Sequence, residues 1–515
     1  MKKKAVFASF PVILMILAAV PLASSRAQSS DSGDAELDRI VARAMSVHGV
    51  PGAGVAVVKN AEVAWARGYG LADTEDGIPV DSETVFEAAS VSKPVTAWGI
   101  MTLVEDGRID LDAPISRYVK RWSLPPSEYD HDLITVRRIL SHTAGLSEDG
   151  DTGVEPGQPV PTIEEALSGA IWGTRPLHVE RAPGEDFHYA SNAYSLLEMA
   201  VEEITGESFS TYMQREVLDP LGMRNSSYDW TPALRAQAAV GHDWYNHPLP
   251  EYVYSTRAQG SLRTTPADLA IFLAASMPGP HGEPVGRGVI SPESVNEILT
   301  PVPFAKSPES SHVIGLGFDL IEVDGNVAGA RKTGDHRGWK PLVVMDMAHG
   351  DGIVIMANSD RAAIGFLIDI ACGWSRGLEV DLMRADCREL MTIRDVQLII
   401  ASVIALGALF YFASFLRGIR SGKRRPNPRL TAGRLLLVTL LLALLAAWWI
   451  AWHTDTIFTD ILKRYPAGMA VTVRALVPWP TAFVWISRAV TLWFLAWIAA
   501  VFVPRVKKLD RHSVQ

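Results

Sequence analysis

The order of strand-like and helix-like segments between residues 34 and 375 limits the fold of this 515-residue chain more than any other sequence feature. An amphipathic helix is predicted over residues 34–48, and strand-like runs follow at 53–59 and 63–70, joined by a turn at Asn60. The middle of the chain has helical periodicity, and strand-like runs return after residue 312 as an antiparallel meander. Strands at both ends with helices between them predict one α+β domain, an antiparallel sheet flanked by helices with a helical subdomain.

Periodicity and turn residues also place the individual elements of this domain. Strands are predicted at residues 313–323, 326–333, 341–345 and 352–357. Helices are predicted at residues 191–204, 210–218, 268–275, 292–299 and 362–372. A further, mostly apolar helix is predicted after Lys93, with Gly107 as its stop.

The last hundred or so residues are far more apolar than the rest of the chain. Residues 396–416 carry no charge and are long enough to span a bilayer, and further spans are predicted at 435–452 and 481–503, the last with Arg488 inside it. Lys and Arg are concentrated between the first two spans and in the tail, which the positive-inside rule assigns to the cytoplasm. Three transmembrane helices are therefore predicted, with the folded domain on the outer side; buried hairpin helices of a soluble protein are the alternative.

The N-terminus agrees with that topology. Lys2, Lys3 and Lys4 precede an apolar run and a small-residue cleavage site ending at Ala27, which predicts a signal peptide over residues 1–27, with an uncleaved anchor as the alternative. The predicted division is then a folded domain (34–375), a juxtamembrane linker (376–395), a three-span membrane region (396–503) and a cytoplasmic tail (504–515). This predicts a multi-pass protein of the bacterial inner membrane with the lipid bilayer as a partner.

Composition excludes several classes of partner and cofactor. The net charge is −9 and the folded part has no basic stripe, so nucleic acid is not expected to bind. The 13 histidines include no His-x-x-x-His pair with a glutamate, and no metal or cofactor is predicted. The two cysteines, Cys372 and Cys387, can pair in an exported region or remain free and buried, and the oligomeric state is not determined.

Ser90 and Lys93 form the one Ser-x-x-Lys spacing in the chain. Pro94 fits only the first turn of a helix, so Ser90 is predicted at or near a helix N-terminus, with Lys93 on the same face. A serine hydroxyl becomes a good nucleophile when a neighbouring base takes its proton, and a lysine can be that base when burial or positive charge lowers its pKa. An ordinary capped helix with a surface lysine is the alternative for this motif alone.

Two further segments carry residues suited to the same chemistry. Tyr189 and Ser191 lie where a loop is predicted to meet a helix, and a phenol can relay a proton to or from a serine if cations lower its pKa. Lys332, Thr333 and Gly334 end a predicted strand, where the lysine offers a positive charge to a substrate carboxylate or to the phenol. The glycine there is expected to let a substrate backbone approach closely.

Taken together, Ser-x-x-Lys, Tyr-x-Ser about a hundred residues later and Lys-Thr-Gly on a late strand resemble the penicillin-recognising serine hydrolases, and within them the class C β-lactamase, penicillin-binding protein and esterase branch. The resemblance covers about residues 34–375 and none of the three predicted spans. Further stretches that are similar to the branch lie at residues 140–146, 220–223, 262–268 and 352–360.

The resemblance implies a role for each motif residue. Ser90 is the acylated nucleophile, while Lys93 and Tyr189 share the general-base work. Substrate binding and the oxyanion hole are implied for Lys332, Thr333, Gly334 and Asp335, the last through its backbone N–H together with that of Ser90. The branch usually has asparagine where this chain has Ser191, which argues against efficient β-lactam hydrolysis but not against acyl transfer.

These observations predict a membrane-anchored, extracytoplasmic serine hydrolase that acts through an acyl-enzyme on an ester, a D-amino-acid peptide or amide, or a β-lactam. The alternative is a non-catalytic protein that binds or senses cell-wall peptides with a hydrolase-like domain. Gly373 to Gly377 also matches the Gly-x-Ser-x-Gly nucleophile elbow around Ser375. An elbow follows a strand, whereas a helix is predicted before Ser375, so we expect that serine to be inactive.

Overall fold

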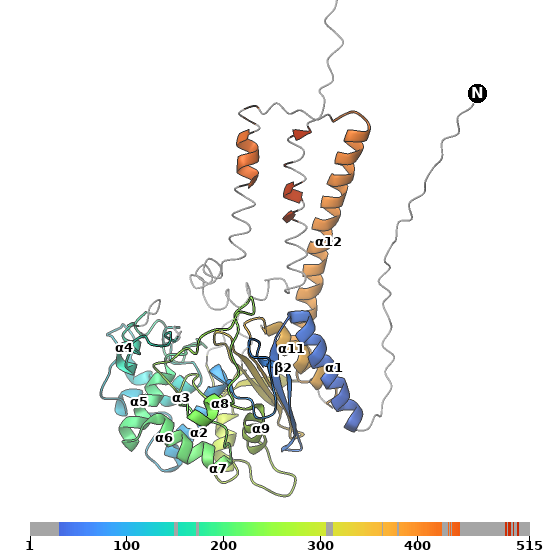
Figure 1. Ribbon diagram of the computed structural model, residues 1–515. Helices are drawn as coiled ribbons and strands as arrows, with labels where there is room; N and C mark the ends of the chain where they lie inside the picture. The colour runs from blue at the N-terminus through green and yellow to red at the C-terminus, as the bar shows by residue number, and fades with distance from the viewer. Residues whose placement is uncertain are drawn as a thin grey trace, which may run out of the picture.

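The computed structural model describes residues 30–442, apart from 149–152, 171–174, 305–312, 363, 379–380, 425–430, 432 and 434, and scattered residues between 490 and 503. The predicted signal peptide (1–27) and tail (504–515) lie outside the described residues, as does most of the third predicted span. The domain that the structure describes is built around a twisted sheet with helices on both sides, and a long helix extends away from it (Figure 1).

The central sheet has eight antiparallel strands in the order β3-β2-β1-β10-β9-β8-β7-β6. Their bounds are β1 Gly52–Lys59, β2 Glu62–Asp73, β3 Ile78–Pro79, β6 Val313–Ile314, β7 Asp319–Val323, β8 Asn326–Thr333, β9 Lys340–Asp346 and β10 Asp351–Ala357. β1 pairs directly with β10, with Val55 opposite Ile355, so the first and last strands are neighbours at the centre. The predicted sheet built from both ends of the domain is confirmed.

Side chains alternate between the two faces of this sheet, and each face has its own core. Val55, Val57 and Ile355 pack with helices α1 (Ser30–His48) and α11 (Ile364–Ser375). Ala56 and Val354 face the opposite core, toward helices α2 (Ser92–Glu105) and α9 (Pro266–Ala275). Because neighbouring residues of a strand point to opposite faces, β1 and β10 are buried on both sides, as their runs of valine, isoleucine and alanine require.

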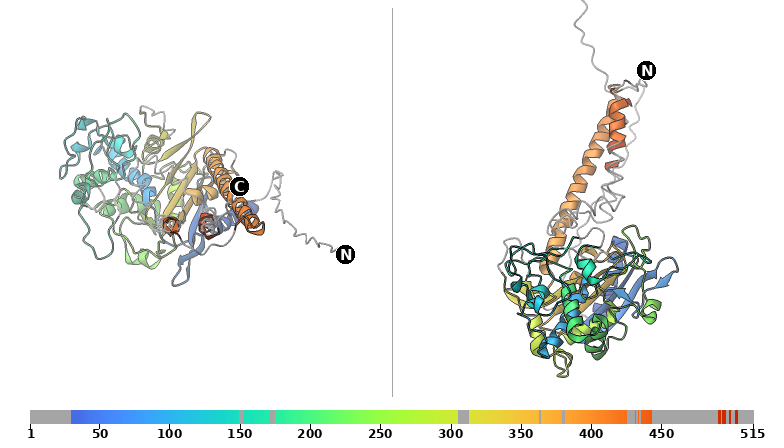
Figure 2. Two further views of the ribbon diagram at one scale, coloured as in Figure 1. Left: turned by 90° about the horizontal axis from the view of Figure 1, so that it is seen from above. Right: turned by 90° about the vertical axis from the view of Figure 1, so that its left-hand side faces the viewer.

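The helical subdomain lies beyond α2, on the side of the sheet away from α1 and α11 (Figures 1 and 2). A short second sheet, β4 (Phe86–Glu87) with β5 (Arg263–Thr264), joins it to the nucleophile segment. The helices of this part and its connections are α3 Val136–Leu140, α4 Ile163–Leu167, α5 Tyr194–Thr205, α6 Phe209–Met213, α7 Asp219–Leu221, α8 Pro232–Ala236 and α10 Pro292–Ile298. Single-turn 3₁₀ segments lie at η1 Ala89–Val91, η2 Ile115–Arg117 and η3 His131–Leu133, and a π-helical turn, η4 Gln214–Leu218, extends α6.

Two predicted elements differ from the structure for local reasons. The strand predicted at 313–323 is broken into β6 and β7, because Gly317 turns with φ 85° against the backbone of Lys93, where a Cβ atom would lie 3.1 Å from the Lys93 carbonyl. The helix predicted from residue 191 begins at Tyr194, because the preceding turn closes with tighter bonds three residues apart, such as Tyr194 N to Ser191 O.

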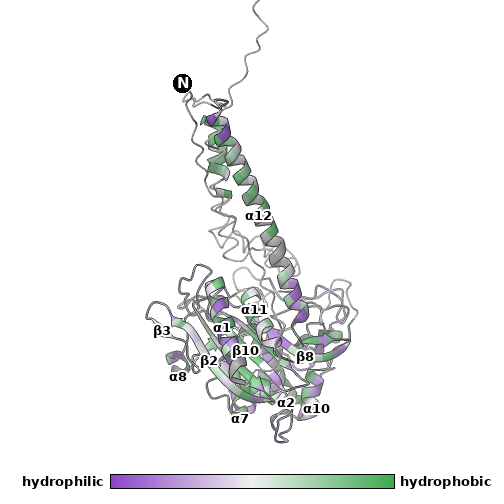
Figure 3. Ribbon diagram, turned by 90° about the vertical axis from the view of Figure 1, so that its right-hand side faces the viewer, coloured by the Kyte–Doolittle hydropathy of each residue, from purple (hydrophilic) through white to green (hydrophobic). Residues whose placement is uncertain are grey.

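A long helix, α12 (Arg384–Arg420), leaves the domain and includes the first predicted span. It begins inside the stretch predicted as a linker, and a disulfide between Cys372 and Cys387 ties its first turn to α11. Figure 3 shows apolar residues along much of its length. Within the described residues, however, no helix combines the length and hydropathy needed to cross a bilayer.

Candidate active site

Ser90 lies in the turn η1, between strand β4 and helix α2. β4 is held to β5, and the N–H of Ala88 donates to the Leu262 carbonyl at 2.8 Å, which fixes the chain just before the serine. Ala89 then adopts a left-handed backbone with φ 45°, a conformation that costs a non-glycine residue about 1 kcal/mol. This sharp turn leaves Ser90 partly exposed at the start of an otherwise buried helix.

Lys93 is fully buried and makes three hydrogen bonds through its Nζ atom. Its partners are Ser90 Oγ at 3.1 Å, Ser191 Oγ at 3.0 Å and the Gln259 carbonyl at 2.6 Å. Burial lowers the pKa of Lys93, Tyr189 acts in the opposite direction, and the positive charge of Lys332 lowers the pKa further. A neutral lysine amine has two N–H groups and one lone pair, which this set of partners can satisfy with the lone pair facing Ser90.

Tyr189 reaches the same serine from the loop before α5. Its Oη lies 2.8 Å from Ser90 Oγ, and the Nζ atoms of Lys93 and Lys332 stand 5.3 and 5.2 Å from its ring centroid. Desolvation acts to raise the pKa of Tyr189, but the charges of Lys93 and Lys332 and the bond with Ser90 together bring it below its ordinary value. The phenol can therefore exchange a proton with the serine.

The Lys-Thr-Gly segment ends β8 next to these groups. Lys332 is buried, with Asp319 Oδ1 3.6 Å from its Nζ. Thr333 is half-buried and pairs with Leu342 of β9. The side chain of Asp335 is exposed and forms an ion pair with Lys340 at 2.8 Å. The structure thus brings Ser90, Lys93, Tyr189, Ser191 and Lys332 together, and the Asp335 side chain pairs with the buried Lys340.

Gly334 is packed closely against the segment that precedes Ser90. A Cβ atom there would lie 2.8 Å from the Ala88 carbonyl and 2.9 Å from the Ala89 side chain, so the glycine allows β8 to pack against the turn that presents Ser90. The segment before Ser90 makes this close approach, and the approach of a substrate backbone to Gly334 stays a prediction. A side chain at Gly334 would push the two halves of the site apart.

Sequence reasoning missed three groups near the site. The Gln259 carbonyl accepts a hydrogen bond from Lys93, but every residue has a backbone carbonyl, so the residue type gives no indication of this role. The buried Glu198 carboxylate accepts from the N–H groups of Arg257 (2.6 Å) and Ala258 (2.9 Å), which are adjacent to Gln259. His142 stacks on Tyr189 with ring centroids 4.2 Å apart. His142 lies in one of the stretches that carried the family resemblance, and its position there was the available signal.

The competing serine motif is structural. Ser375 is fully buried at the end of α11, where its hydroxyl donates to Asp381 at 2.8 Å and accepts from the Met383 N–H at 3.2 Å. It follows a helix rather than a strand, which confirms the prediction that it is not a nucleophile elbow. Ser375 instead shapes the turn that leads to α12.

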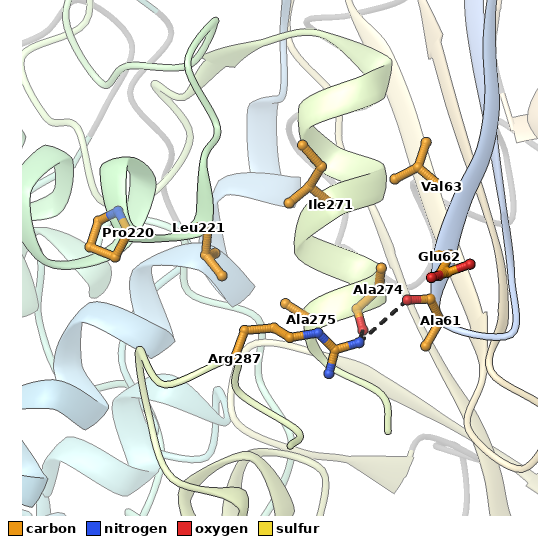
Figure 4. Close-up of a pocket in the computed structure, with 9 residues that line it drawn as sticks. All are labelled: Ala61, Glu62, Val63, Pro220, Leu221, Ile271, Ala274, Ala275 and Arg287. Carbon is orange, nitrogen blue, oxygen red and sulfur yellow. Dashed lines mark hydrogen bonds between the residues drawn. The ribbon is translucent and has the colours of Figure 1, made fainter. Parts of the chain in front are cut away.

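A surface cavity of about 560 Å³ lies elsewhere, between the β1–β2 turn, α7 and α9 (Figure 4). Arg287 reaches across it and donates to the Ala61 and Ala274 carbonyls. The guanidinium is committed to carbonyl groups, and none of the candidate catalytic groups lines this cavity. We therefore assign Arg287 a structural role, in which it joins α9 to the sheet.

Comparisons with known proteins show what the chain is similar to. A family model described as "Beta-lactamase" matches residues 37–365. Among curated relatives, "Protein flp" of Staphylococcus aureus (strain N315) is 26% identical over 211 residues, 40% of this chain and 41% of the relative. "Esterase EstB" of Burkholderia gladioli is 30% identical over 203 residues, 38% of this chain and 51% of the relative. The matches thus span about half or less of these relatives' length.

Solved structures show the same fold at low identity. The octameric penicillin-binding protein homologue from Pyrococcus abyssi has a TM-score of 0.53 and 24% identity, over 65% of this chain and 77% of that one. A class C beta-lactamase mutant has a TM-score of 0.56 and 21% identity, over 67% and 98%. The beta-lactamase/D-alanine carboxypeptidase from Pseudomonas syringae has a TM-score of 0.53 and 19% identity, over 66% and 98%.

Proposed function

The chain belongs to the beta-lactamase family of serine hydrolases, and from this premise we propose that it hydrolyses an ester or a small D-amino-acid peptide or amide through an acyl-enzyme on Ser90. One observation carries the proposal: Ser90 Oγ is within hydrogen-bond distance of both Lys93 (3.1 Å) and Tyr189 (2.8 Å). A nucleophile with a base in reach, and a base oriented by further groups, is the signature of covalent catalysis. A protein that only bound cell-wall peptides would not need this arrangement.

In the acylation step, the Ser90 O–H bond breaks while its oxygen bonds to the substrate carbonyl carbon. The proton passes to the Lys93–Tyr189 pair, because the Lys93 amine has a lone pair to offer once its N–H groups are directed to Ser191 and Gln259. The pair then returns that proton to the leaving oxygen or nitrogen as the scissile bond breaks. Water attacks the acyl-enzyme by the same proton route in reverse, which releases the acid and restores Ser90.

The substrate is bound by the groups around the serine. The backbone N–H groups of Ser90 and Asp335 would stabilise the oxyanion, and Lys332 and Thr333 would bind a substrate carboxylate or polar group. Ser191 offers one short hydroxyl, already in contact with Lys93, where the family pattern has an amide. We therefore propose simple esters and small D-amino-acid derivatives as better substrates than β-lactams with acylamido side chains.

We further propose that the hydrolase domain is held on the outer face of the bacterial inner membrane. Three sequence features support this proposal: an apolar N-terminal segment preceded by lysines, the uncharged stretch 396–416 and the Arg-rich loop that follows it. Large apolar side chains of α12 are exposed, including Leu406 (66%) and Phe410 (76%). The Cys372–Cys387 disulfide suits an oxidising compartment.

Covalent labelling tests the proposed chemistry. We expect a fluorophosphonate probe to label the full-length protein on the Ser90 peptide, and Ser90→Ala to abolish labelling and turnover of chromogenic esters, D-amino-acid amides and nitrocefin. Ser375→Ala is the matched control and should keep both. Labelling at Ser375, or none together with no turnover, would refute the serine hydrolase assignment.

A further inference from the structure

His142 contacts Tyr189 and both of its chain neighbours. Its backbone carbonyl accepts from the N–H of His188 at 2.8 Å, and its ring Nδ1 accepts from the N–H of Ala190 at 3.3 Å. The ring itself lies against the Tyr189 ring, with centroids 4.2 Å apart and planes 36° apart. One residue therefore binds the neighbours of Tyr189 on both sides and the phenol ring between them.

These contacts require one tautomer of a neutral imidazole. An acceptor at Nδ1 means that the ring proton sits on Nε2. Burial, and then the positive charges of Lys332 and Lys93, hold the pKa of His142 well below its ordinary value, so the ring stays neutral. Nδ1 therefore keeps the lone pair that the Ala190 N–H needs.

The arrangement costs stability. The Nε2 atom of His142 is buried, and within the described residues no group accepts its hydrogen. An unsatisfied buried donor lowers the stability of the folded protein. His142 also has a left-handed backbone with φ 56°, a conformation in which histidine, asparagine and aspartate are enriched. A residue kept at this cost, against the phenol, points to a role beyond packing.

We propose that His142 is a positioning residue for the acyl-transfer reaction: it holds the Tyr189 hydroxyl at Ser90 through its two hydrogen bonds and its ring stack. This inference rests on the proposed function. Within the described residues, His142 has no hydrogen bond or ring contact with Ser90, and it acts only through Tyr189. Without the imidazole, the segment 188–190 keeps the backbone bond from His188 but loses the bond from Ala190 and the ring stack, and the 2.8 Å contact between Tyr189 and Ser90 is no longer enforced.

Two substitutions separate the hydrogen bond from the ring. In His142→Asn, the side-chain Oδ1 takes the place of Nδ1 as acceptor, and asparagine tolerates the left-handed backbone. His142→Phe keeps an aromatic ring against Tyr189 but has no acceptor for Ala190. We expect kcat/KM for p-nitrophenyl acetate to fall by less than about fivefold in His142→Asn and by about 10- to 100-fold in His142→Phe, the loss that misplacing a catalytic group by about 1 Å brings.

A double-mutant cycle with Tyr189→Phe supplies the decisive measurement in the full-length protein. Because His142 acts through the phenol hydroxyl, His142→Phe should lower kcat/KM little further once that hydroxyl is gone. His48→Asn, at a buried histidine of α1 that contacts Asp369, is the matched control and should keep full activity. Thermal unfolding of each variant shows that the compared proteins are folded.

The outcomes separate this inference from the proposed function. If the wild type is not acylated on Ser90, the proposed function fails and the inference fails with it. If the wild type is acylated but the Asn and Phe variants at position 142 lose activity equally, only the positioning role is overturned. The same holds if His142→Phe lowers kcat/KM by as large a factor in the Tyr189→Phe background as it does alone.

Discussion

The Nζ atom of Lys93 lies 2.6 Å from the carbonyl oxygen of Gln259, its shortest contact. A carbonyl can only accept, so this contact holds one N–H of the lysine away from Ser90 whatever the protonation state. Ser191 Oγ accepts a second N–H of the lysine at 3.0 Å. The remaining position on the amine faces the nucleophile, so a neutral lysine, which the lowered pKa of the buried amine favours, presents its lone pair to Ser90.

Substituting Lys93 tests whether its lone pair or its charge matters. Lys93→Met removes the base but retains a buried chain of similar length, and Lys93→Arg retains a charge that cannot be lost near neutral pH. We expect both to lower kcat/KM for p-nitrophenyl acetate by about 10²- to 10⁴-fold, the usual share of general-base catalysis. Near-normal activity in Lys93→Arg would show that charge alone suffices.

Glu198 should make the stability of the protein depend on pH. Burial raises its pKa from 4.5 to about 7, so the folded protein holds this proton more tightly than the unfolded chain. The contribution of this proton to the free energy of unfolding is complete below about pH 4.5. It declines as the pH rises and is lost above about pH 7. A pKa shift of that size corresponds to a change of about 3 kcal/mol in the free energy of unfolding.

Glu198→Gln checks this assignment, because the amide oxygen can still accept from Arg257 and Ala258 but does not titrate. Urea unfolding from pH 4 to 8 should show the decline in the wild type and a flatter profile in the variant. Equal profiles in the two proteins would assign the pH dependence to other groups.

Local sequence signals were enough for much of the fold. The strands β8 and β10 and the apolar helix after Lys93 were predicted almost to their ends, because each is several residues long and is bounded by turn residues. β4 and β5 were missed because two residues are too few to show a period. The break between β6 and β7 depends on the backbone of Lys93, more than two hundred residues earlier in the chain.

The site was predicted through side chains whose chemistry is specific to the residue type. Ser90, Lys93, Tyr189 and Lys332 meet as predicted, although they come from three separate stretches of the chain. Gln259 contributes a carbonyl that every residue has, so its identity carries no information. For Glu198 and His142 the residue types alone gave no sign of a role, because each bonds to backbone N–H groups that only the tertiary structure brings near.

Reporter fusions test the membrane proposal. Fusions after Arg425 and after Lys508 should report a cytoplasmic position, and a fusion after Gly377 an external one, because the Lys and Arg clusters follow the first and third predicted spans. Alkaline phosphatase and green fluorescent protein at each site serve as opposite reporters. A reversed result at any site would refute the proposed orientation, and a soluble full-length protein would refute the anchoring.

Substrate choice should depend on Ser191. Its hydroxyl accepts from Lys93 at 3.0 Å, so it is committed to the base and offers at most one donor to a substrate. In Ser191→Asn, the amide oxygen can take over the contact with Lys93, while its NH₂ group is free to donate to the acyl-amide of a β-lactam. One recovered hydrogen bond is worth about 1 kcal/mol, or several-fold to about tenfold in rate. We expect the ratio of kcat/KM for nitrocefin to that for p-nitrophenyl acetate to rise by that factor.

Ser191→Ala is the matched control for this substitution. It removes the Lys93 contact without adding a donor, so it should slow both substrates together and leave their ratio near that of the wild type. A ratio in Ser191→Asn that does not exceed the one in Ser191→Ala, or a wild type that already prefers nitrocefin, would show that the hydroxyl at this position does not set the preference. In that event Ser191 would act only by orienting Lys93, and Ser191→Ala would show this as an equal loss in kcat/KM on the two substrates.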